Sequence, residues 1–267
     1  MKLKNMRLLA AVLAAIFLCG CSFLLPQEEP APTEPTAPET TRETIPPNPY
    51  EPEDFTTEGE FVDCVTGKTR KGIDVSSWQG DIDWQQVKES GVEFVMIRAG
   101  WRGSEQGVLS TDRNAQQNYE GAKAAGLEVG CYFFSQAISP EEAVEEAEFL
   151  LQQIEHWELS MPVAYDWEYI SADSRTGNME PRLLTDCTIA FCERIREAGY
   201  APMIYFNVNQ SHKQMYLEEL TDYPFWLAMY EAEMNYPYKI HMWQYSNTGT
   251  VPGIEGDVDL NMQFIYE

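Results

Sequence analysis

The amino-acid sequence predicts an α/β protein built as a single irregular (β/α) barrel of about eight strands, with some helices missing. Eight short segments rich in β-branched and aromatic residues occur between residues 70 and 267. Helical patterns, with apolar residues three and four positions apart, separate several of these segments. Alternating strands and helices favour a parallel sheet, and eight strands in about 200 residues favour a sheet that closes into a barrel.

Strands and helices alternate along most of this region. The expected strands cover residues 71–78, 92–101, 127–135, 161–169, 201–207, 225–230, 240–246 and 256–264. The expected helices cover residues 83–91, 113–126, 139–154, 181–199 and 209–220. Ser139 and Pro140, followed by two glutamates, are typical of a helix start. Gly91, Gly126 and Gly199 stand where helices should end. We expect helices to be missing late in the chain.

The N-terminal residues are typical of an export signal. A basic stretch is followed by an apolar run too short to span a bilayer comfortably, and then by Leu18-Cys19-Gly20-Cys21. This pattern resembles a bacterial lipoprotein signal peptide over residues 1–20. The resemblance implies cleavage before Cys21 and a diacylglycerol on its thiol. The alternatives are an ordinary secretory signal and an uncleaved anchor.

Residues 21–69 differ in composition from the barrel region. Pro, Thr and Glu dominate from Pro26 to about Glu60, and aliphatic residues are scarce. Such a segment cannot form a core, so we expect a disordered, extended linker. At about 3.1 Å per residue it could reach on the order of 100 Å. The barrel domain would then cover residues 70–267.

The charge of the chain excludes one class of partner. The formal net charge is -25. Because contacts with phosphates need clustered Lys and Arg, we expect no nucleic-acid binding. The acidity of the chain favours solubility and does not indicate a particular function.

The segment PVAYDWEY carries two acids in an apolar setting. Asp166 and Glu168 are two residues apart, so in a strand both side chains face the same way. Burying two unpaired carboxylates is costly unless partners, water or protonation relieve the cost. For this pair alone, an ion pair or solvation at a strand end would be a sufficient explanation.

The predicted barrel brings further acids to the same place. The carboxyl ends of barrel strands form the active face. Asp74 near the end of the first strand, and Asp257 or Asp259 in the last strand, would join Asp166 and Glu168 there. Crowded carboxylates in an apolar setting raise one another's pKa, so one acid can donate a proton while another stays ionised. Glycosidic cleavage requires this division of roles.

Aromatic and polar residues near the strand ends could form a saccharide groove. Any one of them alone is better explained by packing in the barrel core or rim. Asn207 and Gln244 could bond sugar hydroxyl or acetamido groups, or equally cap a neighbouring helix or strand. The candidate substrate-binding residues are Trp78, Arg98, Trp101, Tyr132, Phe134, Tyr205, Asn207, Trp226, Tyr230, Gln244 and Tyr245.

Metal and cofactor chemistry is not indicated. The histidines lie in different segments without partners at the spacing of metal ligands. Cys187 and Cys192 are five residues apart on one predicted helix and point in different directions. Cys131 fits a buried strand position, and we expect Cys64 to be free although a disulfide is conceivable in an exported protein. We therefore expect neither a metal site nor a cofactor.

Several motifs, taken in order, are more specific than any single pair of acids. KGIDVSSWQG, AGLEVGCYFF, PVAYDWE, MIYFN, FWLAMY and WQYSNTGTVPGIEGDVDLN together resemble the glycoside hydrolase family 25 lysozymes over roughly residues 70–267. The resemblance implies an irregular (β/α) barrel that hydrolyses the β-1,4 bond between N-acetylmuramic acid and N-acetylglucosamine in peptidoglycan.

The resemblance also implies roles for individual residues. Glu168 corresponds to the general acid. Asp166 corresponds to its partner, which assists the acetamido group of the substrate or stabilises a cationic intermediate. Asp74 and Asp259 match two further active-site aspartates. Phe133 stands where the family commonly has a histidine, which predicts the loss of one polar contact with the sugar or the catalytic acid.

The sequence thus predicts a monomeric muramidase, anchored through Cys21 to the outer face of the bacterial cytoplasmic membrane and facing the cell wall. Two other interpretations remain open. One is a wall-binding lipoprotein that holds glycan without cutting it, although such a binder has no need of a buried proton donor. The other is a glycosidase that acts on chitin-like oligomers.

Overall fold

The computed structural model describes residues 44–231 and 233–266. The predicted signal peptide, Cys21 and the first part of the predicted linker lie outside the described residues. No helix of the described chain is both long enough and apolar enough to cross a bilayer.

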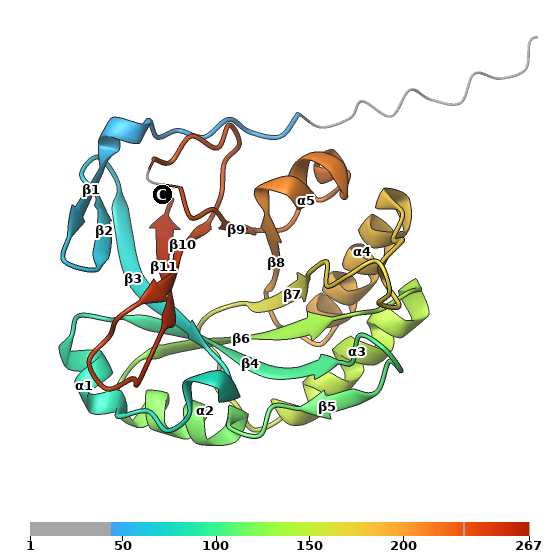
Figure 1. Cartoon of the computed structure of the whole chain (residues 1–267), viewed down its shortest axis with the longest axis horizontal. Coiled ribbons are helices and arrows are strands. Elements are labelled where there is room, and N and C mark those ends of the chain that lie inside the picture. The colour runs from blue at the N-terminus through green and yellow to red at the C-terminus, as the bar shows by residue number, and fades with distance from the viewer. Residues whose placement is uncertain (1–43, 232, 267) are drawn as a thin grey trace, which may run out of the picture. The chain divides into compact units, whose positions relative to one another are not determined.

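Eight strands close into a barrel (Figure 1). In spatial order the barrel runs β3, β11, β10, β9, β8, β7, β6 and β4, and it closes where β4 pairs with β3. All neighbours are parallel except β11, which is antiparallel to both β10 and β3. The strands are β3 (Lys68–Val75), β4 (Phe94–Arg102), β6 (Glu128–Ser135), β7 (Val163–Trp167), β8 (Pro202–Asn207), β9 (Phe225–Ala228), β10 (Met242–Gly249) and β11 (Val258–Ile265). The predicted barrel and its eight strands are confirmed.

Helices connect the first strands and are missing between the last ones, as predicted. The α-helices are α1 (Trp84–Glu89), α2 (Ala115–Ala124), α3 (Pro140–Gln153), α4 (Pro181–Glu197) and α5 (Val208–Lys213). The segment 209–220 differs from the expected single helix, because it divides into α5 and a short 3-10 helix, Leu217–Glu219. The N–H of Tyr216 donates to Thr185 Oγ1 at 3.1 Å instead of continuing the helical ladder.

The predicted helix ends are confirmed by local geometry. The Ser139 hydroxyl accepts a hydrogen bond from the N–H of Glu142, and Pro140 occupies the first turn of α3. Gly91, Gly126 and Gly199 have φ angles of +97°, +76° and +89°. Residues with side chains rarely adopt such angles, so glycine is the favoured residue at these three helix ends.

Residues 44–69 differ from the extended linker that composition predicts. They contain a 3-10 helix, Pro52–Asp54, and a hairpin of β1 (Phe55–Glu58) and β2 (Phe61–Cys64). Tyr50 stacks on Phe264 of β11 with ring centroids 5.1 Å apart, and Phe55 contacts the same ring. These aromatic contacts, together with main-chain hydrogen bonds from Asn48 to Pro237 and from Lys239 to Pro46, dock this segment on the barrel. One further short strand, β5 (Leu109–Thr111), pairs antiparallel with β4.

Side-chain alternation divides the buried residues into two sets. The larger core fills the space between the barrel and its helices. A smaller cluster includes Phe94, Met96, Ala164, Met203 and Trp226. Ala164 belongs to this smaller cluster, and Asp166 and Glu168 follow it at two-residue steps. Asp166 therefore lies on the same face of β7 as Ala164, and Glu168, one residue beyond the strand, continues in the same direction above this apolar cluster.

Candidate active site

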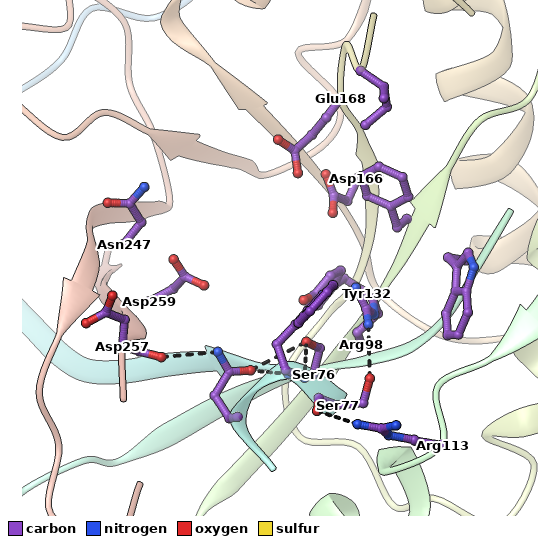
Figure 2. Close-up of a pocket in the computed structure, with 15 residues that line it drawn as sticks. Ser76, Ser77, Arg98, Arg113, Tyr132, Asp166, Glu168, Asn247, Asp257 and Asp259 are labelled. Carbon is purple, nitrogen blue, oxygen red and sulfur yellow. Dashed lines mark hydrogen bonds between the residues drawn. The ribbon is translucent and has the colours of Figure 1, made fainter. Parts of the chain in front are cut away.

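A pocket of about 890 Å³ opens at one rim of the barrel (Figure 2). Strands β4, β6 and β7 reach it with their carboxyl ends, and the antiparallel β11 reaches it with its amino end. This is the position that barrel enzymes use for catalysis. The lining residues are Ser76, Ser77, Trp78, Gln79, Arg98, Trp101, Arg113, Tyr132, Phe134, Asp166, Glu168, Ile170, Asn247, Asp257 and Asp259.

Asp166 and Glu168 share one wall of this pocket, as expected from their spacing (Figure 2). Asp166 lies within β7 and is buried, and Glu168 comes directly after the last residue of the strand. Burial, followed by the charge of Glu168, raises the pKa of Asp166 well above its usual value. Burial and the charge of Asp74 raise the pKa of Glu168 as well. The site therefore favours the protonated forms of these two carboxyl groups more than water does.

Asp166 also carries an unused acceptor. Its Oδ1 atom is buried and has no hydrogen-bond partner among the described residues. A buried acceptor without a donor is costly, and the residue that carries it lines the pocket.

Asp74 lies in β3, below the pocket, and is 4% exposed. Its Oδ2 atom accepts hydrogen bonds from Gln244 Nε2 at 2.7 Å and from Asn261 Nδ2 at 2.8 Å. Burial raises the pKa of Asp74 to about 6, while these two bonds oppose the rise. Above that pH the two amide donors stabilise an ionised Asp74.

A second layer of hydrogen bonds fixes those amides. The hydroxyl groups of Tyr205 and Tyr230 donate to Gln244 Oε1 at 2.9 and 2.7 Å. The indole N–H of Trp226 donates to Asn261 Oδ1 at 2.8 Å. These contacts orient both amides with their N–H groups toward Asp74. Tyr205, Trp226, Tyr230 and Gln244 are thus placed around Asp74 and do not line the pocket.

Asp259 completes the group of acids. Its Cα is paired with that of Asp74 across the β3–β11 ladder, and Figure 2 shows its carboxylate across the pocket from Asp166 and Glu168. Burial, then the charges of Asp74 and Glu168, raises the pKa of Asp259 to about 8. The other candidate from this part of the sequence, Asp257, directly precedes β11 and also lines the pocket.

The other wall of the pocket is aromatic and cationic. Trp78 is 84% exposed at the rim, and Trp101, Tyr132 and Phe134 line the pocket with it. Arg98 lies over the Trp101 ring at 5.1 Å and forms an ion pair with Asp112 at 2.8 Å. Exposed aromatic faces beside hydrogen-bonding groups suit the two sides of a pyranose ring.

Three sequence expectations have a different outcome in the structure. The Asn207 side chain caps α5, accepting from the N–H of Gln210 at 3.0 Å. Tyr245 lies toward β2, where its hydroxyl accepts from the N–H of Val62 at 3.4 Å. Neither residue lines the pocket. Phe133 is fully buried against Phe149 and Phe191, so its side chain faces the helices and does not line the pocket.

Several residues of the site were not predicted from the sequence. Ser76, Ser77 and Gln79 belong to the turn after β3, Arg113 and Ile170 come from other loops, and Asn247 lies near the end of β10. Loops that follow barrel strands are the usual source of such residues, which is the one signal that could have indicated them. Asn261 was also missed, although it holds Asp74.

The described residues include no group of three His, Cys, Asp or Glu side chains placed to hold a metal ion. Cys64, Cys131, Cys187 and Cys192 are buried free thiols. Burial raises the pKa of Cys187 to about 12, so this thiol stays protonated at neutral pH.

Sequence comparison links this site to known enzymes. The sequence profile of Glycosyl hydrolases family 25 matches residues 73–254, a range that includes Asp74, Asp166 and Glu168. The autolytic lysozyme of Clostridium acetobutylicum is 33% identical over 195 residues, which are 72% of this chain and 55% of the relative. The chain thus spans little more than half of the length of that relative.

Structural comparison finds the same fold. A bacterial lysozyme from Streptomyces coelicolor superimposes with a TM-score of 0.58 at 25% identity, covering 74% of this chain and 93% of the other. The modular autolysin LytC from Streptococcus pneumoniae, solved in complex with a synthetic peptidoglycan ligand, gives a TM-score of 0.64 at 22% identity. That match covers 73% of this chain and 46% of LytC.

Proposed function

The chain belongs to glycosyl hydrolases family 25, and from this premise we propose that it is a peptidoglycan hydrolase. It cleaves the β-1,4 bond between N-acetylmuramic acid and N-acetylglucosamine. The observation that carries the proposal is the convergence of Asp166, Glu168 and Asp259 in one pocket, above a buried Asp74. Crowded acids with raised pKa values suit acid-base cleavage of a glycosidic bond.

Glu168 is the general acid in this proposal. Its raised pKa favours the protonated form of the carboxyl group, and Glu168 lines the pocket from the end of β7. It donates its proton to the glycosidic oxygen as the bond between that oxygen and the anomeric carbon breaks, with the bonding electrons leaving on the oxygen. Water later adds to the anomeric carbon, and its surplus proton returns to the carboxylate.

Asp166 stabilises the positive charge that develops at the sugar, directly or through the acetamido group of the substrate. Its place in the wall of the pocket supports this role, because an acetamido N–H would donate to its carboxylate there. That bond would also lower the pKa of Asp166 and favour its ionised form when substrate is bound. Asp74, whose pKa is about 6, adds negative charge around the same centre above that pH.

The aromatic wall positions the glycan. Trp78, Trp101, Tyr132 and Phe134 offer ring faces or edges to pyranose rings, and Arg98 lies beside them. Binding energy from such contacts holds the scissile bond close to the carboxyl groups, which is a large part of catalysis by proximity. The protein acts as a monomer in this proposal, since a single chain supplies all of these groups.

Product analysis tests the proposed reaction. Purified peptidoglycan is digested, and the new reducing ends are identified by mass spectrometry after borohydride reduction. Reduced N-acetylmuramic acid ends support the proposal. Reduced N-acetylglucosamine ends would instead identify a glucosaminidase. Binding without any new ends would favour a glycan-binding protein, and a preference for chitin oligomers over peptidoglycan would change the substrate.

The location of the enzyme is a separate part of the proposal. Leu18-Cys19-Gly20-Cys21 supports lipidation of Cys21, and a diacylglycerol provides two acyl chains, enough for stable anchoring where one chain is marginal. The enzyme would then face the cell wall from the outer face of the cytoplasmic membrane. The part of the predicted linker from Cys21 to residue 43 lies outside the described residues.

A further inference from the structure

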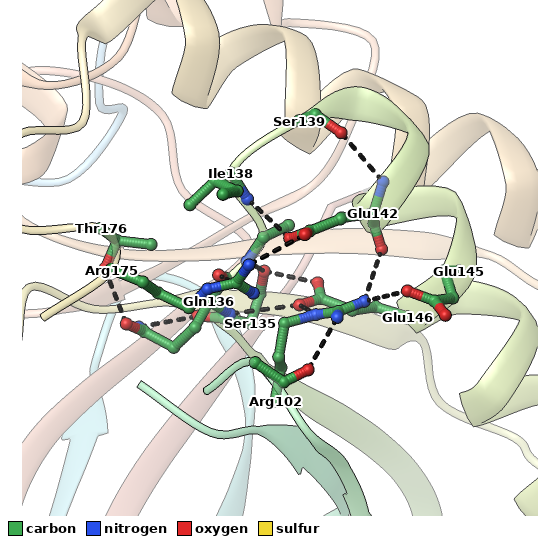
Figure 3. A network of polar contacts seen from close by, with 12 residues as sticks. Arg102, Ser135, Gln136, Ile138, Ser139, Glu142, Glu145, Glu146, Arg175 and Thr176 are labelled. Carbon is green, nitrogen blue, oxygen red and sulfur yellow. Dashed lines mark hydrogen bonds and ion pairs between the residues drawn. The ribbon is translucent and has the colours of Figure 1, made fainter. Parts of the chain in front are cut away.

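A buried polar network lies behind the pocket, centred on Glu146 of α3 (Figure 3). Glu146 is fully buried. Its carboxylate accepts from Ser135 Oγ at 2.5 Å, from Arg102 Nε at 2.8 Å and from the N–H of Gln136 at 3.2 Å. Burial raises the pKa of Glu146 to about 7, although the bonds from Ser135 and Arg102 oppose the rise. A buried charge with this many partners fixes the positions of the groups around it.

The network reaches the active site through Gln136. The Gln136 side chain is fully buried, and its Nε2 donates to the carbonyl oxygen of Glu168 at 2.9 Å and to that of Ser135 at 2.8 Å. Its Oε1 accepts from the hydroxyl of Thr176 at 2.6 Å. Because two carbonyl oxygens face Nε2, only one orientation of the amide satisfies all three contacts.

The segment that carries Glu168 depends on such contacts. The last residue of β7 is Trp167, so Glu168 lies beyond the ladder that holds the strand. Two side-chain amides hold the main chain there: Gln210 Nε2 donates to the carbonyl of Trp167, and Gln136 donates to that of Glu168. Tyr169, the next residue, is 50% exposed. The backbone of Glu168 is therefore fixed mainly by buried amides.

The loop after Glu168 is attached to the same network. Arg175 Nη1 donates to the carbonyl of Gln136 at 3.1 Å, and Arg175 Nη2 forms an ion pair with Glu142 at 2.8 Å. Thr176, its neighbour, is 1% exposed and bonds the Gln136 side chain. Gln136 thus joins the end of β6, the end of β7 and the loop that leads to α4.

We infer that Gln136 is a positioning residue for Glu168, held in place by the buried Glu146–Arg102 pair, an inference that rests on the proposed function. Gln136 does not line the pocket, so it acts through the main chain of Glu168. Displacing a reacting group by about 1 Å can cost roughly 100-fold in rate. Holding the carbonyl of Glu168 restricts the direction in which its carboxyl group points into the pocket.

The test replaces the amide and keeps the length of the side chain. In Gln136→Met we expect kcat on soluble peptidoglycan fragments to fall roughly 10- to 100-fold, with KM within about two-fold. We also expect the upper limb of the pH–activity profile to move to lower pH, because a displaced Glu168 becomes better solvated. If the substitution affected only stability, neither kcat nor the upper limb of the pH–activity profile would change.

Thr188→Val is the matched control. Thr188 is fully buried in α4, and its hydroxyl donates to the carbonyl of Leu184 at 2.8 Å. This variant loses a buried hydrogen bond that is not connected to Glu168, so kcat and the pH profile should stay as in the wild type. If Gln136→Met does not fold, Thr176→Val releases the Gln136 amide without removing it, and the same change in kcat is expected.

Two results separate the inference from the proposed function. A kcat within two-fold of wild type in folded Gln136→Met, with Glu168→Gln inactive, would overturn the positioning role alone. If Gln136→Met does not fold, an unchanged kcat in folded Thr176→Val would overturn the positioning role. Full activity of Glu168→Gln would instead overturn the assignment of the general acid, on which the inference rests.

Discussion

Asp74 and Asp259 lie opposite each other on the antiparallel strands β3 and β11, one buried below the pocket and one in its wall. Asp74 has two amide donors on one oxygen, whereas no side-chain hydrogen bond lowers the pKa of Asp259. The pKa values are accordingly about 6 and about 8. Two aspartates in neighbouring positions thus titrate differently, because only one of them is solvated by the protein.

Activity should follow a bell-shaped pH profile, and Asp74→Asn should move its upper limb. The acid Glu168 must be protonated, so activity falls as pH rises through its raised pKa. The charge of Asp74 contributes to that raised pKa. Removing the charge lowers the pKa of Glu168, so the upper limb of the residual activity shifts to lower pH.

The control for this shift is Asp81→Asn, at an exposed aspartate outside the pocket wall. Its profile should coincide with that of the wild type. An unshifted upper limb in Asp74→Asn would mean that Asp74 does not set the proton affinity of the acid.

The fold should lose stability as pH rises from about 5 to 8. Asp74, Glu146 and Asp259 have pKa values of about 6, 7 and 8 in the folded chain, against roughly 4 when unfolded. Between these values the folded state binds more protons than the unfolded state, so the free energy of unfolding decreases with increasing pH. Thermal unfolding, followed by circular dichroism at several pH values, measures this loss of stability. An unfolding midpoint temperature that rises from pH 5 to pH 8 would contradict the prediction.

Asp259→Asn should stabilise the fold at high pH and leave its stability at low pH unchanged. At pH 8 it removes a carboxylate crowded by Asp74 and Glu168, and we expect stabilisation by about 1 kcal/mol, or roughly 2–4 °C in Tm. At pH 5 the wild-type group is already protonated, so the two midpoints should nearly coincide. Equal stabilisation at both pH values would indicate an effect of packing and not of charge.

Much of the fold and the acids of the site could be predicted from the sequence. The eight strands have the composition and spacing of barrel strands, and the two-residue step from Asp166 to Glu168 fixes their common face. The antiparallel direction of β11 could not be predicted, because antiparallel and parallel strands have similar composition. That direction is what places Asp259 beside Asp74.

The places where the structure differs from the sequence-based expectations have identifiable physical causes. Tyr205, Trp226 and Gln244 were expected to contact sugar, but they lie deeper in the barrel and orient the groups around Asp74. Depth along a strand depends on the tilt and stagger of the barrel, which no local pattern contains. Residues 44–69 were expected to be extended because composition averages over Tyr50 and Phe55, whose rings dock on β11.

Cys21→Ala tests the proposed anchor. Without a lipidated cysteine, the protein should move from the membrane fraction to the medium. Its activity on isolated peptidoglycan should persist, since every proposed catalytic residue lies at or after Asp74. Cys19→Ala is the control, because Cys19 precedes the proposed cleavage site. Retention of Cys21→Ala in the membrane would mean that the apolar run itself is the anchor.

The most direct test of the central claim is the turnover of purified peptidoglycan by Glu168→Gln beside the wild type. Glutamine keeps the shape of the side chain but cannot deliver a proton, and loss of general acid catalysis typically costs about 10²–10⁴-fold in rate. We predict a loss of this size in the release of N-acetylmuramic acid reducing ends, with an unchanged thermal midpoint or a higher one and with glycan binding retained. Turnover within a few-fold of the wild type would contradict the assignment of Glu168 as the general acid.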